Sequence, residues 1–551
     1  MSDALWWQGA IIYQIYPRSF MDANGDGIGD LRGIEKKLDY LEKLGVDALW
    51  ISPFFLSPMK DFGYDIADYR QVDPMFGSLE DFDRLTKKAH ERGLKIMIDQ
   101  VLSHTSDQHA WFQQSQQDKN NSKADWYVWA DAKADGTAPN NWLSVFGGSA
   151  WQWHEQRQQY YLHNFLSSQP DLNYHSAELR KAILGEVKFW LDRGVDGFRF
   201  DAINYCYHDQ KLRDNPFKPR AQRKARGFSE DNPYAAQYHY YDNNRPEMLD
   251  FLQELRKLMD QYQGISSVGE INTEDSLQSI SEYTSKQRLH LGYSFELLAG
   301  ERSADYVRQT VSTLQNKLEN GMACWAISNH DVERVASRWS DDGQVKPEQA
   351  SMLSIMCACL RGTICVYQGE ELGLGEAQLS KEQLRDPFGI KFWPEFKGRD
   401  GCRTPMPWDK NKQHAGFSQG SPWLPIAAEH LAHTVEQQQQ QKNSCLNRYR
   451  EFLHWRKQRK SLRLGLIEFA EAKQDCLAFV RVFESEYTLC VFNFSAQYLE
   501  LDLGFLLAQL KLDGQIDNLQ KIDLGCVNAR IDKHTLQLPA YAFLLADINK
   551  T

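Results

Sequence analysis

The chain has 551 residues, a formal net charge of −11 and an aromatic content of 12%. A chain of this length predicts two or three domains, and its acidic balance argues against nucleic acid as a partner. No run of about 18 apolar residues predicts a membrane span, and no basic segment followed by an apolar run predicts a signal peptide. The 10 cysteines show no metal-ligand spacing, so they are expected to be free thiols. Together these features indicate a reduced, cytoplasmic enzyme and leave its oligomeric state open.

Short β-rich runs alternate with longer amphipathic stretches along most of the chain, a pattern typical of parallel β/α architecture. Helices are predicted at 79–92, 177–193 and 246–262. The predicted strands are 11–16, 48–52, 95–101, 197–201, 265–270, 289–295, 324–328 and 362–367. Eight strands separated by helices predict an α/β fold of the (β/α)8 TIM-barrel type.

Two insertions and a change of pattern divide the chain further. Residues 104–171 are rich in Trp, Asn, Gly and Gln and predict a small inserted domain after the third strand, whereas 204–244 form a second, polar insertion. After about residue 460 the pattern has period two, and the runs 476–483, 487–494 and 536–546 predict a C-terminal antiparallel β-sandwich. The expected domains are a barrel of 1–103 and 172–458, an inserted domain of 104–171 and a sandwich of 459–551.

Four short segments place a carboxylate or an imidazole at a strand end, which is the face where barrel enzymes hold their chemistry. The segments are Asp99-Gln-Val-Leu-Ser-His104, Gly197-Phe-Arg-Phe-Asp201, Val268-Gly-Glu270 and Ser328-Asn-His-Asp331. Any one of them alone would fit a structural ion pair or a helix cap. Four at successive strand ends favour an active site.

The second and third segments carry the elements of glycosidic bond cleavage. Arg199 and Asp201 are two residues apart on a strand and share a face, so the guanidinium should keep the carboxylate ionised for nucleophilic attack. Glu270 ends an apolar strand, where burial would raise its pKa and suit it to donate a proton. A carboxylate nucleophile facing a protonated acid predicts cleavage with retention.

These four segments resemble the four signature regions of the α-amylase family, glycoside hydrolase family 13. The runs 45–53 and 366–370 are similar to that family's second and eighth barrel strands. The segment Gln169-Pro-Asp-Leu-Asn173 resembles the marker of its α-glucosidase and oligo-1,6-glucosidase subgroup, and 141–151 and 403–408 also look like that subgroup. The resemblance covers the barrel and the inserted domain, and more weakly the sandwich.

The resemblance implies a role for each matched residue. Asp201 would be the nucleophile, Glu270 the general acid and then base, and Asp331 a third carboxylate that holds ring hydroxyls in the transition state. His104, Arg199 and His330 match residues that bind ring hydroxyls or orient the nucleophile, and Asp99 is expected to support them.

The resemblance also implies how the glucose is enclosed. Asp61 and Tyr64 match a clamp on the non-reducing end, and Arg399 matches the arginine that pairs with Asp61. Such a pair would close the pocket and explain exo action on small substrates. Phe146 and Phe165 are candidate apolar walls, with plain packing as the alternative reading.

Ala202, directly after the nucleophile, bears on linkage preference. In similar enzymes a valine at this position goes with α-1,6 preference, and smaller residues or threonine go with α-1,4. The chain departs from the family at Ser103, where an asparagine is usual, which puts one minor hydrogen bond in doubt.

The expected activity is that of a retaining exo-α-glucosidase acting on terminal α-1,4 bonds of short α-glucosides such as maltose, with some transglucosylation. The alternatives are an oligo-1,6-glucosidase, a predominantly transglucosylating enzyme, and a family member or glycan-binding module without catalysis.

A loop near the N-terminus places oxygen ligands at alternate positions, as Ca²⁺ loops do. Gly33 stands where an EF-hand would need its bidentate glutamate, so an EF-hand is not expected. By resemblance the loop would hold a structural Ca²⁺ or Mg²⁺ ion, and an Asp/Gly-rich turn without metal is the alternative. The expected ligands are Asp22, Asn24, Asp26, the Ile28 carbonyl and Asp30. No organic cofactor is expected.

Overall fold

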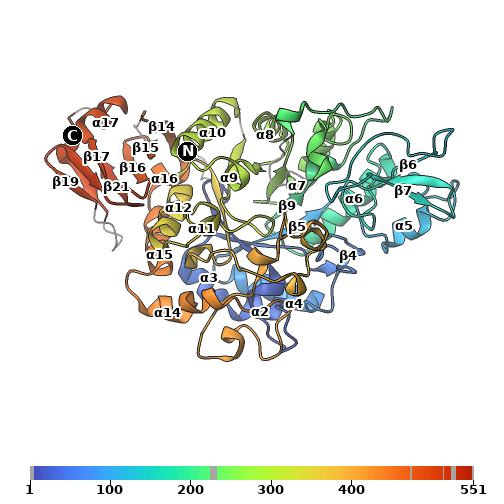
Figure 1. Ribbon diagram of the computed structural model, residues 1–551, viewed down its shortest axis with the longest axis horizontal. Helices are drawn as coiled ribbons and strands as arrows, with labels where there is room; N and C mark the ends of the chain where they lie inside the picture. The colour runs from blue at the N-terminus through green and yellow to red at the C-terminus, as the bar shows by residue number, and fades with distance from the viewer. Residues whose placement is uncertain are drawn as a thin grey trace.

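The computed structural model describes residues 5–223, 232–319, 321–471, 475–512, 514–522 and 529–548. Eight parallel strands close into a barrel at the centre of the molecule (Figure 1). In order around the barrel they are β1 (Ile11–Ile15), β13 (Thr363–Tyr367), β12 (Met322–Trp325), β11 (Leu291–Ser294), β10 (Ser266–Ile271), β9 (Gly197–Asp201), β5 (Lys95–Val101) and β2 (Ala48–Ile51). The predicted TIM barrel is therefore confirmed.

The predicted strands agree with the observed ones except near their ends. The largest shift is in β12, which starts two residues earlier than predicted and ends at Trp325. The last pair that it forms with β13 is that of Trp325 with Ile364. The apolar residues Ala326 and Ile327 are buried without strand pairing, so hydrophobicity alone overstated the length of the strand.

Helices cover the outside of the barrel where the sequence predicts them. Helix α4 (Leu79–His90) starts with a capping box between Ser78 and Asp81, which satisfies backbone donors that a helix start leaves free. Helix α6 (Ala177–Asp192) is capped by Ser176, and α7 (Met248–Met259) buries its apolar face. These caps fix where each connection leaves the barrel.

The segment between β5 and β9 forms a small subdomain beside the barrel, at the right of Figure 1. It contains α5 (Ala110–Ser115) and an antiparallel sheet in the order β6 (Trp129–Ala130), β8 (Gln159–Leu162), β7 (Trp151–His154). The polar insertion 204–244 holds short 3-10 helices, and its residues 224–231 lie outside the described part of the chain.

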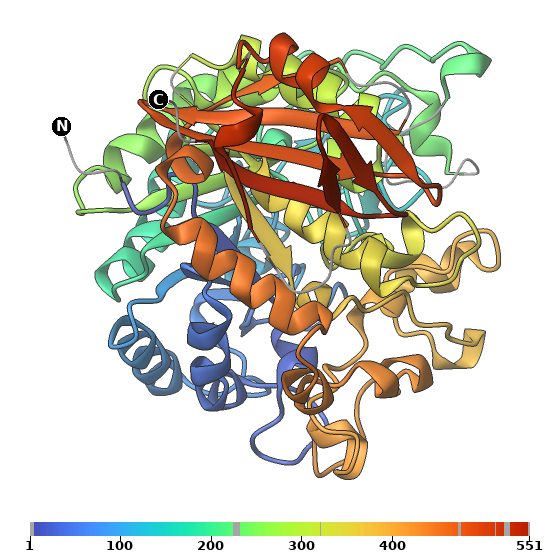
Figure 2. The same cartoon turned by 90° about the vertical axis from the view of Figure 1, so that its left-hand side faces the viewer.

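The C-terminal region packs two antiparallel sheets, which face the viewer in Figure 2. One has the order β14 (Leu466–Phe469), β15 (Cys476–Phe483), β16 (Glu486–Asn493), β21 (Phe543–Ile548), β18 (Leu519–Lys521), and the other β17 (Leu499–Asp502), β20 (Thr535–Leu538), β19 (Arg530–Asp532). The prediction of one strand at 536–546 is wrong: a turn closed by the Ala542 N–H on the Pro539 carbonyl, with Tyr541 at a φ of 55°, divides it between the two sheets.

The described cysteines, nine in all, are buried and unpaired, as expected of free thiols that pack as small apolar groups. Among the helices that the structure describes, none combines the length and the apolar character needed to traverse a bilayer.

Candidate active site

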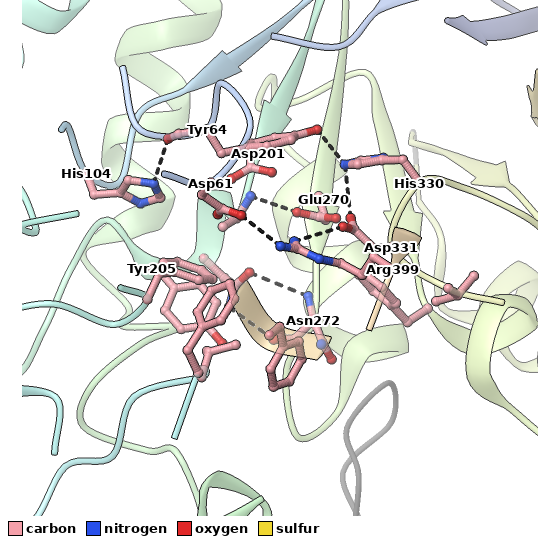
Figure 3. Close-up of a pocket in the computed structure, with 18 residues that line it drawn as sticks. Asp61, Tyr64, His104, Asp201, Tyr205, Glu270, Asn272, His330, Asp331 and Arg399 are labelled. Carbon is pink, nitrogen blue, oxygen red and sulfur yellow. Dashed lines mark hydrogen bonds and ion pairs between the residues drawn. The ribbon is translucent and has the colours of Figure 1, made fainter. Parts of the chain in front are cut away.

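A pocket of about 870 Å³, including its mouth, opens where the barrel strands end (Figure 3). All the predicted catalytic and substrate-binding residues except Arg199, which lies beneath the floor, line this pocket. The lining residues that sequence analysis did not single out are Val145, Asn204, Tyr205, Asn272, Phe295, Val332 and Phe388. The fold thus brings the four strand-end segments together in one cavity.

Arg199 connects the carboxylates of the pocket floor. Its Nη1 lies 2.9 Å from Asp99 Oδ1 and 2.5 Å from Asp201 Oδ1, and its Nη2 lies 2.5 Å from Glu270 Oε1. Alternation along β9 places Arg199 and Asp201 on one face, and the parallel pairing of β5 and β10 with β9 brings the other two carboxyl groups beside them. Three carboxyl groups therefore share one guanidinium.

Glu270 is held for proton donation. Its Oε1 contacts Arg199, and its Oε2 accepts a hydrogen bond of 2.9 Å from the backbone N–H of Ala202. That N–H is available because Ala202 adopts the left-handed conformation, with φ of 41°. Burial raises the pKa of Glu270 to about 8, against the lowering effect of Arg199 and with a further increase from the charge of Asp201. Glu270 is consequently protonated at neutral pH, as the sequence predicts.

The protonation of Asp201 differs from the sequence-based expectation. Burial raises its pKa to about 7, and Arg199 only partly offsets that increase. Asp99, which is also buried, shows the same effect and has a pKa of about 6. The expectation that the Arg199 guanidinium would keep Asp201 ionised is wrong, because its one positive charge is divided among three buried carboxyl groups. Of the three, Glu270 holds its proton most tightly.

Asp331 also lines the pocket and is kept ionised. Its carboxylate lies 3.1 Å from His330 Nε2, 3.3 Å from Arg399 Nη1 and 3.0 Å from Arg403 Nη2. Burial opposes the charged form, but His330 and the two guanidinium groups outweigh burial and hold the pKa well below its usual range. Asp331 can therefore accept hydrogen bonds from substrate hydroxyls at any ordinary pH.

Two buried histidines contribute neutral rings. Burial lowers the pKa of His330 to about 3 and of His104 to about 4. Because the Gln14 amide lies 2.7 Å from Nδ1 of His330, the hydrogen-bond network assigns its ring proton to Nε2. The Tyr64 hydroxyl lies 2.7 Å from that nitrogen and donates to Asp99 over 3.0 Å. At His104, Ser103 supplies a partner 2.9 Å from Nδ1, so the departure at Ser103 retains a hydrogen bond.

An ion-pair cluster closes one end of the pocket. Arg399 lies 2.8 Å from Asp61 and also reaches Asp331 (Figure 3). Its third partner is Asp386, at 2.7 Å. The Gln169 amide donates to the second oxygen of Asp61 over 3.1 Å. Asp61, Gln169 and Asp386 are buried, and the side chain of Arg399 is only 10% exposed, so these four groups form a wall of the pocket. Sequence analysis missed Asp386, which only the fold brings to Arg399.

Aromatic side chains from three regions form another wall. Phe146 and Phe165 of the inserted segment lie with ring centroids 6.4 Å apart. Phe388 contacts Phe146 at 5.0 Å, and Tyr205 contacts Phe165 at 5.1 Å. Both predicted walls therefore line the pocket. Tyr205 and Phe388 come from polar segments in which no local pattern distinguishes a lining aromatic from a packed one.

Comparison with known proteins decides the family. The model of the alpha amylase catalytic domain matches residues 14–465. The chain belongs to the α-amylase family.

Among the named relatives of this family member are α-glucosidases and oligo-1,6-glucosidases. It is 50% identical over 547 residues to a probable alpha-glucosidase of Rhizobium meliloti (strain 1021), covering 99% of this chain and 97% of that protein. It is 37% identical over 527 residues to an oligo-1,6-glucosidase of Parageobacillus thermoglucosidasius, covering 90% and 91%. The crystal structure of an alpha-glucosyl transfer enzyme, XgtA, matches with a TM-score of 0.95 at 57% identity, over 99% of this chain and 100% of that one. This family member is thus a glycoside hydrolase of the α-glucosidase and oligo-1,6-glucosidase type.

The predicted metal loop is closed by its own hydrogen bonds. Asp22 accepts from the backbone N–H groups of Asn24, Gly25 and Gly27, and Asp26 accepts from that of Ile28. In the described ranges, no three or more His, Cys, Asp or Glu side chains are grouped closely enough to hold a metal ion.

The donors of this loop are nevertheless of the oxygen type that Ca²⁺ and Mg²⁺ prefer. Burial raises the pKa of Asp30, and the nearby carboxylates of Asp22 and Asp26 add to that increase, which a cation would relieve. Asn24 and the Ile28 carbonyl would have to bind the cation together with these carboxylates. The metal site therefore stays a prediction.

Proposed function

We propose that this protein is a retaining, exo-acting α-glucosidase that removes terminal α-1,4-linked glucose from short α-glucosides such as maltose. In this proposal a β-glucosyl-enzyme forms on Asp201, and a sugar can replace water as the acceptor. The observation that carries it is a pocket closed at one end by the Arg399–Asp61 pair, with Asp201 and Glu270 both on the Arg199 guanidinium.

The geometry supports a double displacement. Asp201 attacks the anomeric carbon while Glu270 transfers its proton to the leaving oxygen, so the glycosidic bond breaks as the ester bond forms. A water molecule then gives a proton to Glu270 and attacks the same carbon, releasing Asp201. Retaining enzymes need carboxyl groups about 5–5.5 Å apart, against about 6.5–9.5 Å in inverting ones. A guanidinium bonded to both groups favours the closer spacing.

Two observations favour the choice of substrate. The Arg399–Asp61–Gln169 cluster places a linked set of side chains at the pocket where a terminal glucose would lie, which favours cleavage of single glucose units. Ala202, whose backbone N–H bonds Glu270, lines the pocket with only a methyl group, which favours room for an α-1,4-linked sugar near the acid. A cytoplasmic location remains part of the proposal.

Transglucosylation is a second candidate for the main activity. The solved structure of an alpha-glucosyl transfer enzyme matches this chain at 57% identity, and the aromatic wall of Phe146, Phe165, Tyr205 and Phe388 limits the polar surface available to water. Hydrolysis of α-1,6 bonds is the other alternative, since relatives named oligo-1,6-glucosidase are 36–39% identical.

The test is release of glucose from maltose, isomaltose and starch, with the products separated by chromatography. Maltose should react fastest and starch should not react. In Ala202→Val the ratio of maltose to isomaltose hydrolysis should fall about tenfold, because one or two methyl groups in a tight site are worth about 1–3 kcal/mol.

Asp201→Ala serves as the matched control and should show no turnover of any substrate. Faster reaction of isomaltose in the unaltered enzyme would contradict the α-1,4 assignment. New trisaccharides as the main product, even at low maltose, would make transfer the main activity.

A further inference from the structure

Asn272 is a polar residue at the pocket whose side chain is uncommitted. It lines the cavity and is half-buried (Figure 3). In the described part of the chain its side-chain amide makes no hydrogen bond, whereas the ionisable groups of the pocket bond to one another or to their neighbours. A half-buried amide offers two donors and an acceptor oxygen, so a ligand that enters the pocket meets an unused hydrogen-bonding group.

The backbone of Asn272 is fixed even though its side chain is not. The buried Asn204 donates from Nδ2 to the Asn272 carbonyl over 3.1 Å and lies 3.5 Å from its N–H through Oδ1. Asn204 follows strand β9, which carries Asp201. Its hydrogen bonds therefore connect the segment after Asp201 to the segment after Glu270. The Asn272 side chain is therefore presented from a defined position.

The position of Asn272 is on the leaving-group side of the pocket. Glu270 and Asn272 both line the cavity, whereas Ile271 between them is buried in the core. Two residues along an extended chain span about 6.6 Å, which places Asn272 one step above the acid toward the mouth. Since Glu270 protonates the leaving oxygen, the group attached to that oxygen lies beside Glu270 and beneath Asn272.

The apolar part of the pocket lining makes the Asn272 amide selective. Several other residues that line the pocket are apolar, among them Phe295, Val332 and Phe388. A sugar in this region would lose hydrogen bonds to water and could regain one or more from the Asn272 amide. An aryl group would need none of them.

We propose that Asn272 is a specificity-determining residue that hydrogen-bonds a hydroxyl group of the sugar on the leaving-group side. It favours sugars over hydroxyl-free groups, both as the leaving group of the substrate and as the acceptor that competes with water for the glucosyl-enzyme. This inference rests on the proposed function and goes beyond it by assigning the recognition of the second sugar.

The test compares maltose with p-nitrophenyl α-glucoside, which carries the same terminal glucose but whose leaving group has no hydroxyl other than the one released on cleavage. Asn272→Leu keeps nearly the same shape and removes the amide. We expect kcat/KM for maltose to fall about fivefold to tenfold, the effect of a neutral hydrogen bond or two, and kcat/KM for the aryl glucoside to change less than about twofold.

A second readout follows the acceptor. With the aryl glucoside as donor and glucose as acceptor, the ratio of disaccharide to free glucose formed from the donor should fall by a similar factor in Asn272→Leu. If Asn272 only supported the fold, its substitution would lower kcat/KM equally for both substrates and leave the ratio of disaccharide to free glucose unchanged. Equal losses on both substrates, or no loss on either, would overturn the inference.

The controls separate this inference from the proposed function. Thr273→Val alters the neighbouring residue, whose hydroxyl bonds Ser279 outside the pocket, and should leave both ratios unchanged. Asn272→Ala repeats the test if the leucine variant folds poorly. If the unaltered enzyme cleaves neither substrate, the proposed function fails. If it cleaves both and the ratios do not change in the variants, only the role of Asn272 fails.

Discussion

At the scale of single residues, the site is organised by the shortage of positive charge around Arg199. Three buried carboxyl groups contact one guanidinium, so they cannot all be ionised without repelling one another. The group that retains a proton most readily is Glu270. The three groups are all buried and share one cation, and Glu270 also starts from the higher ordinary pKa of a glutamate, which favours it as the acid.

This charge sharing predicts a bell-shaped dependence of kcat/KM on pH for maltose. Activity should rise as Asp201 loses its proton at a pKa of about 7, after Asp99 at about 6, and fall as Glu270 loses its proton at a pKa of about 8. The two apparent values belong to the coupled cluster and not to single residues. Initial rates at low maltose from about pH 5 to about pH 10 measure both limbs.

The alkaline limb is the informative one. Rates that stay level up to about pH 10 would show that no proton on Glu270 is needed and would contradict its role as acid. The acidic limb should come from the carboxyl cluster alone, since His104 and His330 are neutral throughout this range.

At the scale of elements, a loop that follows the first barrel strand connects distant parts of the chain. The loop 22–30 folds around its own Asp22 carboxylate and packs against the chain near Ser418, whose hydroxyl donates to Asp22 over 2.5 Å. It therefore ties the first barrel strand to a segment close to 400 residues later in the sequence. A cation bound here would strengthen that connection.

We accordingly predict that removal of divalent cations with a chelator lowers the melting temperature and that Ca²⁺ or Mg²⁺ restores it. An ion present at one hundred times its Kd stabilises the folded state by about 2.7 kcal/mol. Differential scanning calorimetry of the chelated and reloaded protein measures the shift. Asp26→Ala should remove the response, and a melting temperature indifferent to the chelator would argue for a metal-free turn.

At the scale of the whole molecule, the C-terminal sheets are joined to the barrel by a buried arginine. Arg481 of β15 donates to the carbonyls of Cys359 and Leu360, at 2.6 and 2.9 Å, and to that of Gly465 at 2.9 Å. Cys359 ends helix α12 (Pro347–Cys359), so the cation also meets the negative end of the helix dipole. No carboxylate is needed to hold it.

We predict that Arg481→Met destabilises the protein, because each buried carbonyl left without a donor costs about 1–3 kcal/mol. Thermal unfolding should start at a lower temperature, and the change should be largest for the C-terminal region. Hydrogen exchange of β15 and β16 measures that local effect. Arg530→Met, the same change on the exposed strand β19, should leave both measurements unchanged, and equal effects would contradict the special role of Arg481.

The sequence by itself determined the barrel and the position of the chemistry on it. Apolar strands and amphipathic helices have different periods, and a barrel must turn its strand ends to one face, so Asp201, Glu270 and Asp331 could be placed before any coordinates were known. The pairing of Asp61 with Arg399 depended instead on resemblance to a family, since nothing local connects residues 338 positions apart.

Only the tertiary structure decided what depends on distance between segments and on burial. It showed that Asp386 shares Arg399, that Tyr205 and Phe388 complete the aromatic wall, and that the Asn272 amide has no hydrogen-bond partner among the residues that the structure describes. It also reversed the expected balance at Asp201, because a pKa is set by every charge and every apolar atom nearby and not by the neighbour in sequence. The division of residues 536–546 between two sheets has the same cause: a short turn can redirect a strand whose apolar pattern is continuous.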